Sequence, residues 1–171
     1  ELKIIEAMKR IKMNREKVAD LQIKIGSVSA NLTIETPLYG DQTAAKIKDW
    51  LQSCEDLSRD NIGLLCAIQK TNLATKVKIE LGGKMVEKSI AEWVWRRREY
   101  AKTDLETWQK VNDRGLKEGQ GNSSTGVPLE IRIQRHYDPV ARDEKLALYR
   151  SEPHLIDSAL EIVNATTDLA E

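Results

Sequence analysis

The sequence is poor in the residues that mark several large protein classes. It has two cysteines, two histidines, four prolines, nine glycines and no phenylalanine among 171 residues. Two cysteines without a CxxC companion exclude a disulfide framework and a thiolate zinc site. So little glycine and proline excludes a collagen-like or low-complexity chain. We therefore expect an ordinary globular protein, with one α+β domain over residues 1–171.

Net charge and long apolar runs are absent as well. The chain has 27 Lys and Arg against 27 Asp and Glu, so it is not a generic polyanion binder. No run approaches the roughly 18 apolar residues of a transmembrane helix. The first residues, ELKIIEAMKRIKM, carry charges throughout, unlike a signal peptide. We expect a cytoplasmic protein, or one assembled in a virion, with no membrane partner.

What the sequence does contain is a heptad pattern in its first 74 residues. Apolar residues recur every seven positions in 2–25 and again in 43–74, in two series per segment. With the loop 26–42 between them, these segments predict an antiparallel helical hairpin over 2–74. The seam residues expected to form an interface are Ile4, Ile11, Asn14, Val18, Ile25, Ile47, Trp50, Leu57, Asn61 and Leu64.

One asparagine interrupts each seam, Asn14 in the first helix and Asn61 in the second. A polar seam residue can fix the register and the number of chains in a coiled coil. The two asparagines would then face each other. The alternative is that each side chain points to water.

The rest of the chain reads as alternating strands and helices. Val77, Ile79 and Leu81 alternate with charged residues before a Gly-Gly pair, which predicts a β-hairpin over 75–88. The further elements expected are a helix over 89–114, a loop over 115–126, a strand over 128–135 and a C-terminal helix over 139–165, kinked at Pro153. If the last strand joins the β-hairpin, the fold is α+β: a long antiparallel helical hairpin or bundle with a small three-stranded antiparallel sheet.

Charge is distributed unevenly along the chain. Residues 76–102 contain eight Lys and Arg against four Asp and Glu, whereas 138–171 contain three against eight. The densest cluster is a possible basic patch formed by Arg96, Arg97 and Arg98 beside aromatic residues, a combination that can bind nucleic acid. Consecutive helical residues point about 100° apart, so the three arginines cannot all face one ligand. We expect a solvated helix face with pairing to the acidic segment instead.

No constellation for catalysis is visible. His136 and His154 have nearby carboxylates but no metal-binding spacing, and no nucleophile elbow or phosphate loop occurs. We therefore expect a protein that is not an enzyme, with no catalytic, cofactor-binding or metal-binding residues.

Short motifs run through the chain in a characteristic order. The first helix carries Leu2, Glu6-Ala7, Arg15, Leu21-Gln22 and Ile25. Ile68-Gln-Lys-Thr71-Asn72 with Thr75 fits I-x-x-T-N-x-x-T, and the helix after the hairpin holds Ile90-Ala91-Glu92 and Arg97-Arg98. The segment from Ile162 to Leu169 matches N-W-T-T-[DE]-L, with Ala165 where tryptophan is usual.

In these motifs the chain resembles the septicolysin-like family of small bacterial and prophage proteins. The resemblance covers nearly the whole chain and implies a helical α+β protein that self-associates. It implies no reaction, because the family has no established one. The family's name suggests a cytolysin.

These observations favour a non-enzymatic structural or assembly protein that forms a homo-oligomer, as a capsid or tail component of a phage or prophage virion. Its partners would be itself and other virion proteins. One alternative is a cytolysin-like pore-forming or membrane-active protein, although strands of about five residues are shorter than the 9–11 that span a bilayer. A second is a nucleic-acid-binding accessory protein, which the neutral charge disfavours.

Overall fold

The computed structural model describes all 171 residues of the chain. It is an α+β protein of long helices and two separate two-stranded antiparallel sheets. The residues group into two compact units, one made of residues 1–75 and 160–171 and the other of residues 76–159. Helix α5 (Pro139–Thr166) contributes residues to both units.

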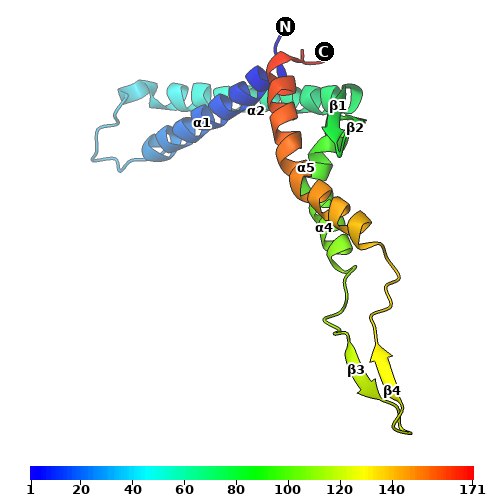
Figure 1. Ribbon diagram of the computed structural model, residues 1–171. Helices are drawn as coiled ribbons and strands as arrows, with labels where there is room; N and C mark the ends of the chain where they lie inside the picture. The colour runs from blue at the N-terminus through cyan, green and yellow to red at the C-terminus, as the bar shows by residue number, and fades with distance from the viewer. The chain divides into compact units, whose positions relative to one another are not determined.

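The first unit is built on a long helical hairpin. Helices α1 (Ile4–Val28) and α2 (Thr43–Ala74) lie side by side and are joined by a loop that ends in the short 3-10 helix η1 (Gly40–Gln42) (Figure 1). The loop expected over residues 26–42 is shorter, because α1 continues through Gly26 to Val28. A glycine in a helix costs only about 1 kcal/mol relative to alanine, so it does not by itself stop the helix.

The core of the first unit lies where the two chain termini meet the hairpin. Ala7 and Ile11 of α1 pack against Leu64 and Ile68 of α2, and Leu2 and Leu169 cover this cluster. The Ile4 N–H donates to the Thr167 carbonyl over 3.1 Å, and the Leu169 N–H donates to the Leu2 carbonyl over 2.7 Å. Lys3 and Asp168 form an ion pair beside these bonds. Both termini are thus fastened to the same end of the hairpin.

The second unit begins with a β-hairpin of β1 (Lys76–Leu81) and β2 (Lys84–Ser89). Its turn consists of Gly82 and Gly83, with φ of 58° and 80°, values that glycine adopts without strain. Ser89 then caps α3 (Ile90–Trp95) by accepting the Glu92 N–H over 3.1 Å, while the Glu92 carboxylate accepts the Ser89 N–H over 3.2 Å. These two reciprocal bonds form a capping box, which fixes the start of the helix.

The single helix expected over 89–114 is interrupted and shorter. After α3 the chain makes a π-helical segment, η2 (Arg96–Tyr100), before α4 (Ala101–Gln109). A π turn inserts a residue into the helical repeat, and periodicity alone does not reveal it. The helix ends early because the Asn112 amide donates to the carbonyls of Gln109 and Lys110, over 3.0 and 3.2 Å.

The prediction of one three-stranded sheet is wrong, because the strands form two separate pairs. Strand β4 (Pro128–Ile131) pairs with β3 (Gly119–Asn122), inside the segment expected to be a loop, and ends four residues before the expected limit of 135. The glycines of β3 resemble a linker in the sequence. One of them has a packing reason: a Cβ on Gly121 would lie 3.2 Å from the Ile131 Cδ1 atom. A local partner also closes a shorter loop than the distant β1–β2 hairpin would.

The C-terminal helix α5 passes through Pro153 without restarting. Proline removes one N–H donor from the helix, and neighbouring packing can offset that loss. Ile156 and Glu152, on either side of the proline, are both buried. Packing at this point therefore keeps the helix continuous through the proline.

Candidate assembly surface

The hairpin is well buried only at the end that carries the termini. We call this end, residues 4–14 of α1 and 64–74 of α2, the proximal half. All of its seam positions are buried: Ile4, Ala7, Ile11 and Asn14 in α1 and Leu64, Ile68 and Thr71 in α2. Thr71 also fastens the C-terminal segment, since its hydroxyl donates to the Ala67 carbonyl and accepts the Ala170 N–H, each over 2.8 Å.

A polar network closes the proximal half. The Asn14 side-chain amide donates to the Asn61 side-chain carbonyl over 2.9 Å and to the Asp60 carboxylate over 2.7 Å. Arg10 forms a two-pronged ion pair with the same carboxylate, over 2.9 and 2.8 Å. Asn14 is only 6% exposed. The two seam asparagines therefore meet each other and do not point to water.

Beyond this network no residue of the hairpin is buried. We call residues 15–28 of α1 and 43–63 of α2 the distal half, and none of them falls in the buried class. The heptad pattern nevertheless continues through it. The seam residues that remain only half-buried are Val18, Leu21, Ile25, Ile47, Trp50, Cys54, Leu57 and Asn61. In the distal half, each helix covers only the side of these side chains that faces it, and their other sides remain exposed to solvent.

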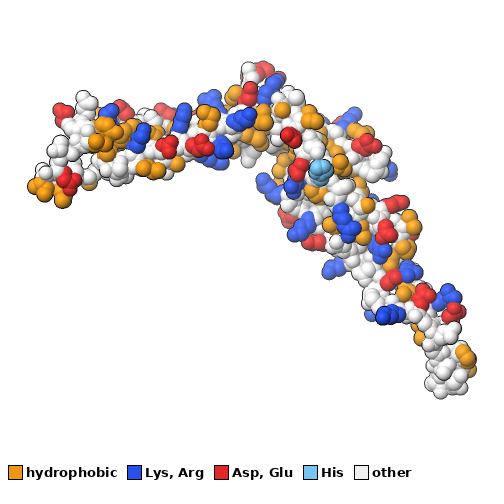
Figure 2. Space-filling model, turned by 60° about the vertical axis from the view of Figure 1, so that its left-hand side comes forward, with side chains coloured by type: hydrophobic (Ala, Val, Ile, Leu, Met, Phe, Trp, Pro, Cys, Tyr) orange, Lys and Arg blue, Asp and Glu red, His pale blue; other side chains and the backbone are white.

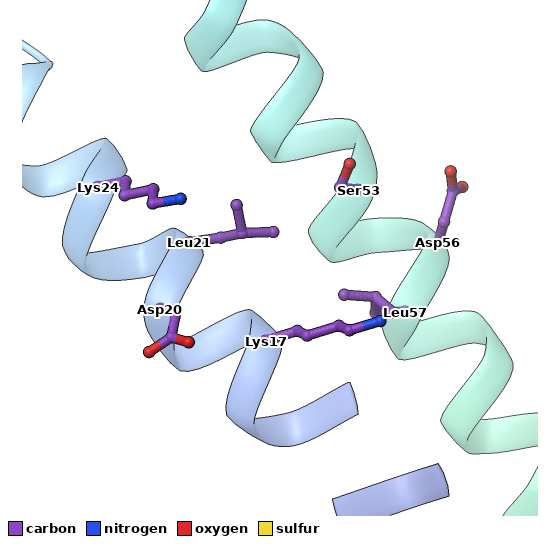
Figure 3. Close-up of a pocket in the computed structure, with 7 residues that line it drawn as sticks. All are labelled: Lys17, Asp20, Leu21, Lys24, Ser53, Asp56 and Leu57. Atoms are coloured by element: carbon purple, nitrogen blue, oxygen red, sulfur yellow. The ribbon is translucent and has the colours of Figure 1, made fainter. Parts of the chain in front are cut away.

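Two grooves accompany the distal seam, one on each side. The first, of about 460 Å³, is lined by Lys17, Leu21, Lys24, Ser53 and Leu57, with Asp20 and Asp56 at its edges. Figure 3 shows Leu21 and Leu57 between the two helices and the Lys17 ammonium reaching towards α2. The second, of about 560 Å³, is lined by Val18, Gln22, Cys54, Glu55, Ser58, Arg59 and Ile62. Ser53 and Ser58 are five residues apart, about 140° around the helix, which puts the grooves on different sides.

The loop at the distal end of the hairpin is also apolar. Leu32, Ile34 and Leu38 are 64%, 90% and 77% exposed. Tyr39 and Trp50 stack edge to face with ring centroids 5.7 Å apart, which ties the loop to α2. In Figure 2, hydrophobic side chains are visible at the surface along the hairpin, among acidic and basic ones. The loop thus adds exposed apolar side chains to the distal end of the hairpin.

The predicted basic patch is largely neutralised within the second unit. Arg96 donates two hydrogen bonds of 2.7 Å to the Glu152 carboxylate and one of 2.6 Å to Asp104. Hydrogen bonding to Glu152 is the main cause that raises the Arg96 pKa above its ordinary value. Glu152 itself is only 2% exposed. This pair is a buried structural link between η2 and α5.

The other two arginines lie in different surroundings. Arg97 donates to Asp157 over 2.7 Å, and this hydrogen bond raises the pKa of Arg97. Arg98 lies over the Trp95 ring, 5.5 Å from its centroid. The basic stretch and the acidic segment therefore meet within one chain, through Arg96 with Glu152 and Arg97 with Asp157. The three arginine side chains thus have three different partners: Arg96 pairs with Glu152, Arg97 with Asp157, and Arg98 lies over Trp95.

A second ionic cluster fastens the base of the β3–β4 arm. Arg135 donates to the Asp113 carboxylate over 2.9 and 2.7 Å, and the Tyr137 hydroxyl donates to it as well. Hydrogen bonds from Arg135, and then from Tyr137, lower the pKa of Asp113 to about 2. These bonds join the segment before β3, which holds Asp113, to the segment after β4, which holds Arg135 and Tyr137.

The histidines and cysteines are scattered. His136 and His154 are both exposed, and Cys54 and Cys66 are free thiols on α2. No group of three or more His, Cys, Asp or Glu gathers in a way that could hold a metal ion. None of the helices combines the length and hydrophobicity needed to cross a bilayer.

Sequence reasoning missed two features of the molecule. Glu152 is an acidic residue beside a proline, and nothing local marks it as buried. The sequence also gives no sign that the seam stops being buried after Asn14, because the heptads before and after this residue look alike. No local signal marks the second feature either, because exposed apolar residues outside the seam occur in both halves of α2: Leu51 and Ile62 in the distal half, Leu65 and Leu73 in the proximal half.

Comparison with known proteins bears on the fold alone. No family model and no curated protein matches the chain. A solved structure described as a functionally unknown conserved protein from Corynebacterium diphtheriae is similar, with a TM-score of 0.56 and 16% sequence identity. The similarity covers 99% of each chain. It indicates a shared fold over the full length of both proteins.

Proposed function

We propose that this protein is a non-enzymatic assembly protein that forms homo-oligomers through the distal half of its helical hairpin. One observation carries the proposal: the heptad seam continues through residues 15–28 of α1 and 43–63 of α2 without a single buried residue. Apolar side chains in such a seam are stabilised when neighbouring helices bury them. Within the chain, the seam residues of each helix are covered only by the other helix of the hairpin.

The energetic argument favours further helices over solvent. Completing the burial of a half-exposed Leu, Ile or Val stabilises by roughly 1 kcal/mol, so a seam of seven apolar residues contributes several kcal/mol when it is covered. Four-helix bundles achieve this by closing both sides of each hairpin seam. A second hairpin supplies the two helices that are missing.

A second copy of the chain suits this surface. The first groove has Lys17 and Lys24 on α1 and Asp56 on α2, so each hairpin presents both signs of charge. Two copies related by symmetry can set the basic edge of one against the acidic edge of the other. Charge pairs at the edge of an interface contribute more to the alignment of the two copies and to the choice of partner than to the affinity.

A place in a phage or prophage particle is part of the proposal, and the resemblance to septicolysin-like proteins is its support. Other virion proteins would then be further partners. Capsid or tail genes beside the gene for this chain would favour that role, whereas a neighbourhood of metabolic genes would count against it. Self-association does not depend on this outcome.

The test is the mass of the particle in solution, measured by light scattering at micromolar concentration. The chain has a mass of 19.4 kDa, and we expect a multiple of it. The variant L51E/I62E, at two exposed distal positions, should shift the mass to a single chain. The matched control is Leu73→Glu, which changes an exposed leucine in the proximal half and should leave the mass unaltered. A wild-type protein that is a single chain throughout would overturn the proposal.

A further inference from the structure

Helix α2 carries a second apolar stripe, which shares only Cys54 with the hairpin seam. It consists of Leu51, Cys54, Ser58, Ile62 and Leu65. These positions lie within about 40° of Ser58 around the helix, so they form one narrow face. Ile62 is 63% exposed, Leu51 is 50% exposed and Leu65 is 41% exposed. The stripe borders the second groove, to which Cys54, Ser58 and Ile62 contribute.

The stripe is symmetric about its serine. Leu51 and Leu65 lie seven residues on either side of Ser58, and Cys54 and Ile62 lie four residues on either side. An antiparallel pair of identical helices on a twofold axis places such positions at the same height. Leu51 would therefore face Leu65 of the second copy, and Cys54 would face its Ile62. The small serine at the centre lets the two backbones approach closely.

Charges beside the stripe obey the same symmetry. Glu55 and Arg59 both lie on the side of the stripe away from the seam. Around a twofold axis at Ser58, Glu55 of one copy comes to within about 3 Å, along the helix axis, of Arg59 of the other. This creates two equivalent opposite-charge pairs at the outer rim. A parallel twofold arrangement would instead place Glu55 of one copy and Arg59 of the other on opposite rims, where they could not pair.

We propose that a second copy docks with its own α2 antiparallel on this stripe, with the twofold axis passing at Ser58. The proposal rests on the assembly function above and specifies its geometry. In this arrangement each α2 fills the second groove of the other copy, and the two hairpin seams turn towards a shared four-helix core. The half-buried residues Val18 and Cys54, which line that groove, are then covered.

Disulfide trapping tests the geometry directly. In a C54A/C66A background, Ser58→Cys places one thiol per chain on the axis, where both Cα atoms come within the roughly 7 Å that a disulfide requires. The control is Gln52→Cys on the outward face of the same helix, whose two copies would lie about 18 Å apart along the axis. Under mild oxidation we expect S58C to form a covalent dimer about tenfold faster than Q52C. The native thiols at Cys54 and Cys66, off the axis, should not cross-link.

The outcomes separate this geometry from self-association in general. A particle with the mass of several chains in which S58C does not cross-link, or cross-links no faster than Q52C, would overturn the twofold axis at Ser58 and leave the assembly function standing. A single-chain mass for the uncross-linked protein would overturn both. As a second check, a chain carrying both Leu51→Cys and Leu65→Cys should form cross-links between copies, since these positions are about 21 Å apart within one helix.

Discussion

Asn14 and Asn61 are joined across the hairpin by a hydrogen bond of 2.9 Å, at the point where the buried half of the seam gives way to the uncovered half. The same Asn14 amide also donates to Asp60. A polar pair at such a boundary aligns the two helices, because a slip by one turn would leave a buried amide without a partner.

Replacing the asparagines one at a time and together tests this role. Asn14→Leu or Asn61→Leu alone should lower the free energy of unfolding by about 1 kcal/mol, because each removes the hydrogen bond between the two amides. Asn61 then has no partner in the first variant, and Asn14 keeps only Asp60 in the second. The double variant should recover that loss or exceed the wild type, while its particle mass becomes heterogeneous. Denaturant unfolding and light scattering measure the two effects. A double variant whose loss equals the sum of the single losses, with a uniform mass, would show that the pair does not set the register.

Glu152 should be the most sensitive carboxylate of the second unit. Glu152→Gln removes one charge of a buried pair and leaves Arg96 with less compensation, which we expect to cost about 3 kcal/mol of stability. The matched control is Asp157→Asn, which breaks the Arg97 pair at the surface and should cost about 0–1 kcal/mol. Thermal or denaturant unfolding compares the two. Equal losses would mean that burial does not distinguish these pairs.

The Asp113 cluster predicts an acid transition at the base of the β3–β4 arm. The pKa of Asp113 is lowered from 3.8 to about 2, so its contribution to stability is fully present above pH 4 and is lost as the pH falls towards 2. An NMR titration of the Asp113 carboxyl carbon should give a midpoint near 2. In Arg135→Gln the midpoint should rise towards 3.8. An ordinary midpoint in the wild type would contradict the cluster.

Nucleic acid should not bind at physiological salt. Arg96 and Arg97 are paired with carboxylates of their own unit, so few cations of the basic stretch remain to release counterions from a phosphate backbone. Fluorescence anisotropy with duplex DNA and single-stranded RNA measures this. A micromolar, salt-dependent affinity that disappears when Arg96, Arg97 and Arg98 are replaced would contradict it.

Local patterns in the sequence predict much of the fold. The heptads predict α1 and α2, the Gly82-Gly83 pair predicts the β1–β2 turn, and the Ser89–Glu92 spacing predicts the start of α3. Each of these signals acts over a few residues. The partner of β4 is a choice between distant segments, and the glycines of β3 hide the strand that pairs with it.

The candidate surface is only partly readable from the sequence. Periodicity identifies which residues share a helix face, but not which neighbour covers that face. Ile11 and Val18 occupy equivalent heptad positions, yet only Ile11 is buried. The difference comes from Leu2, Leu169 and the C-terminal segment, which reach the proximal half and supply its cover.

Amide hydrogen exchange of the wild-type protein tests the central claim most directly. Backbone amides in the distal half, residues 15–28 and 43–63, are compared with those in the proximal half of the same helices. If a second copy covers the distal seam, both halves should exchange with similar slowness, because both then open only with the assembled core. Exchange in the distal half that is orders of magnitude faster, at concentrations of tens of micromolar, would show that no second copy covers it.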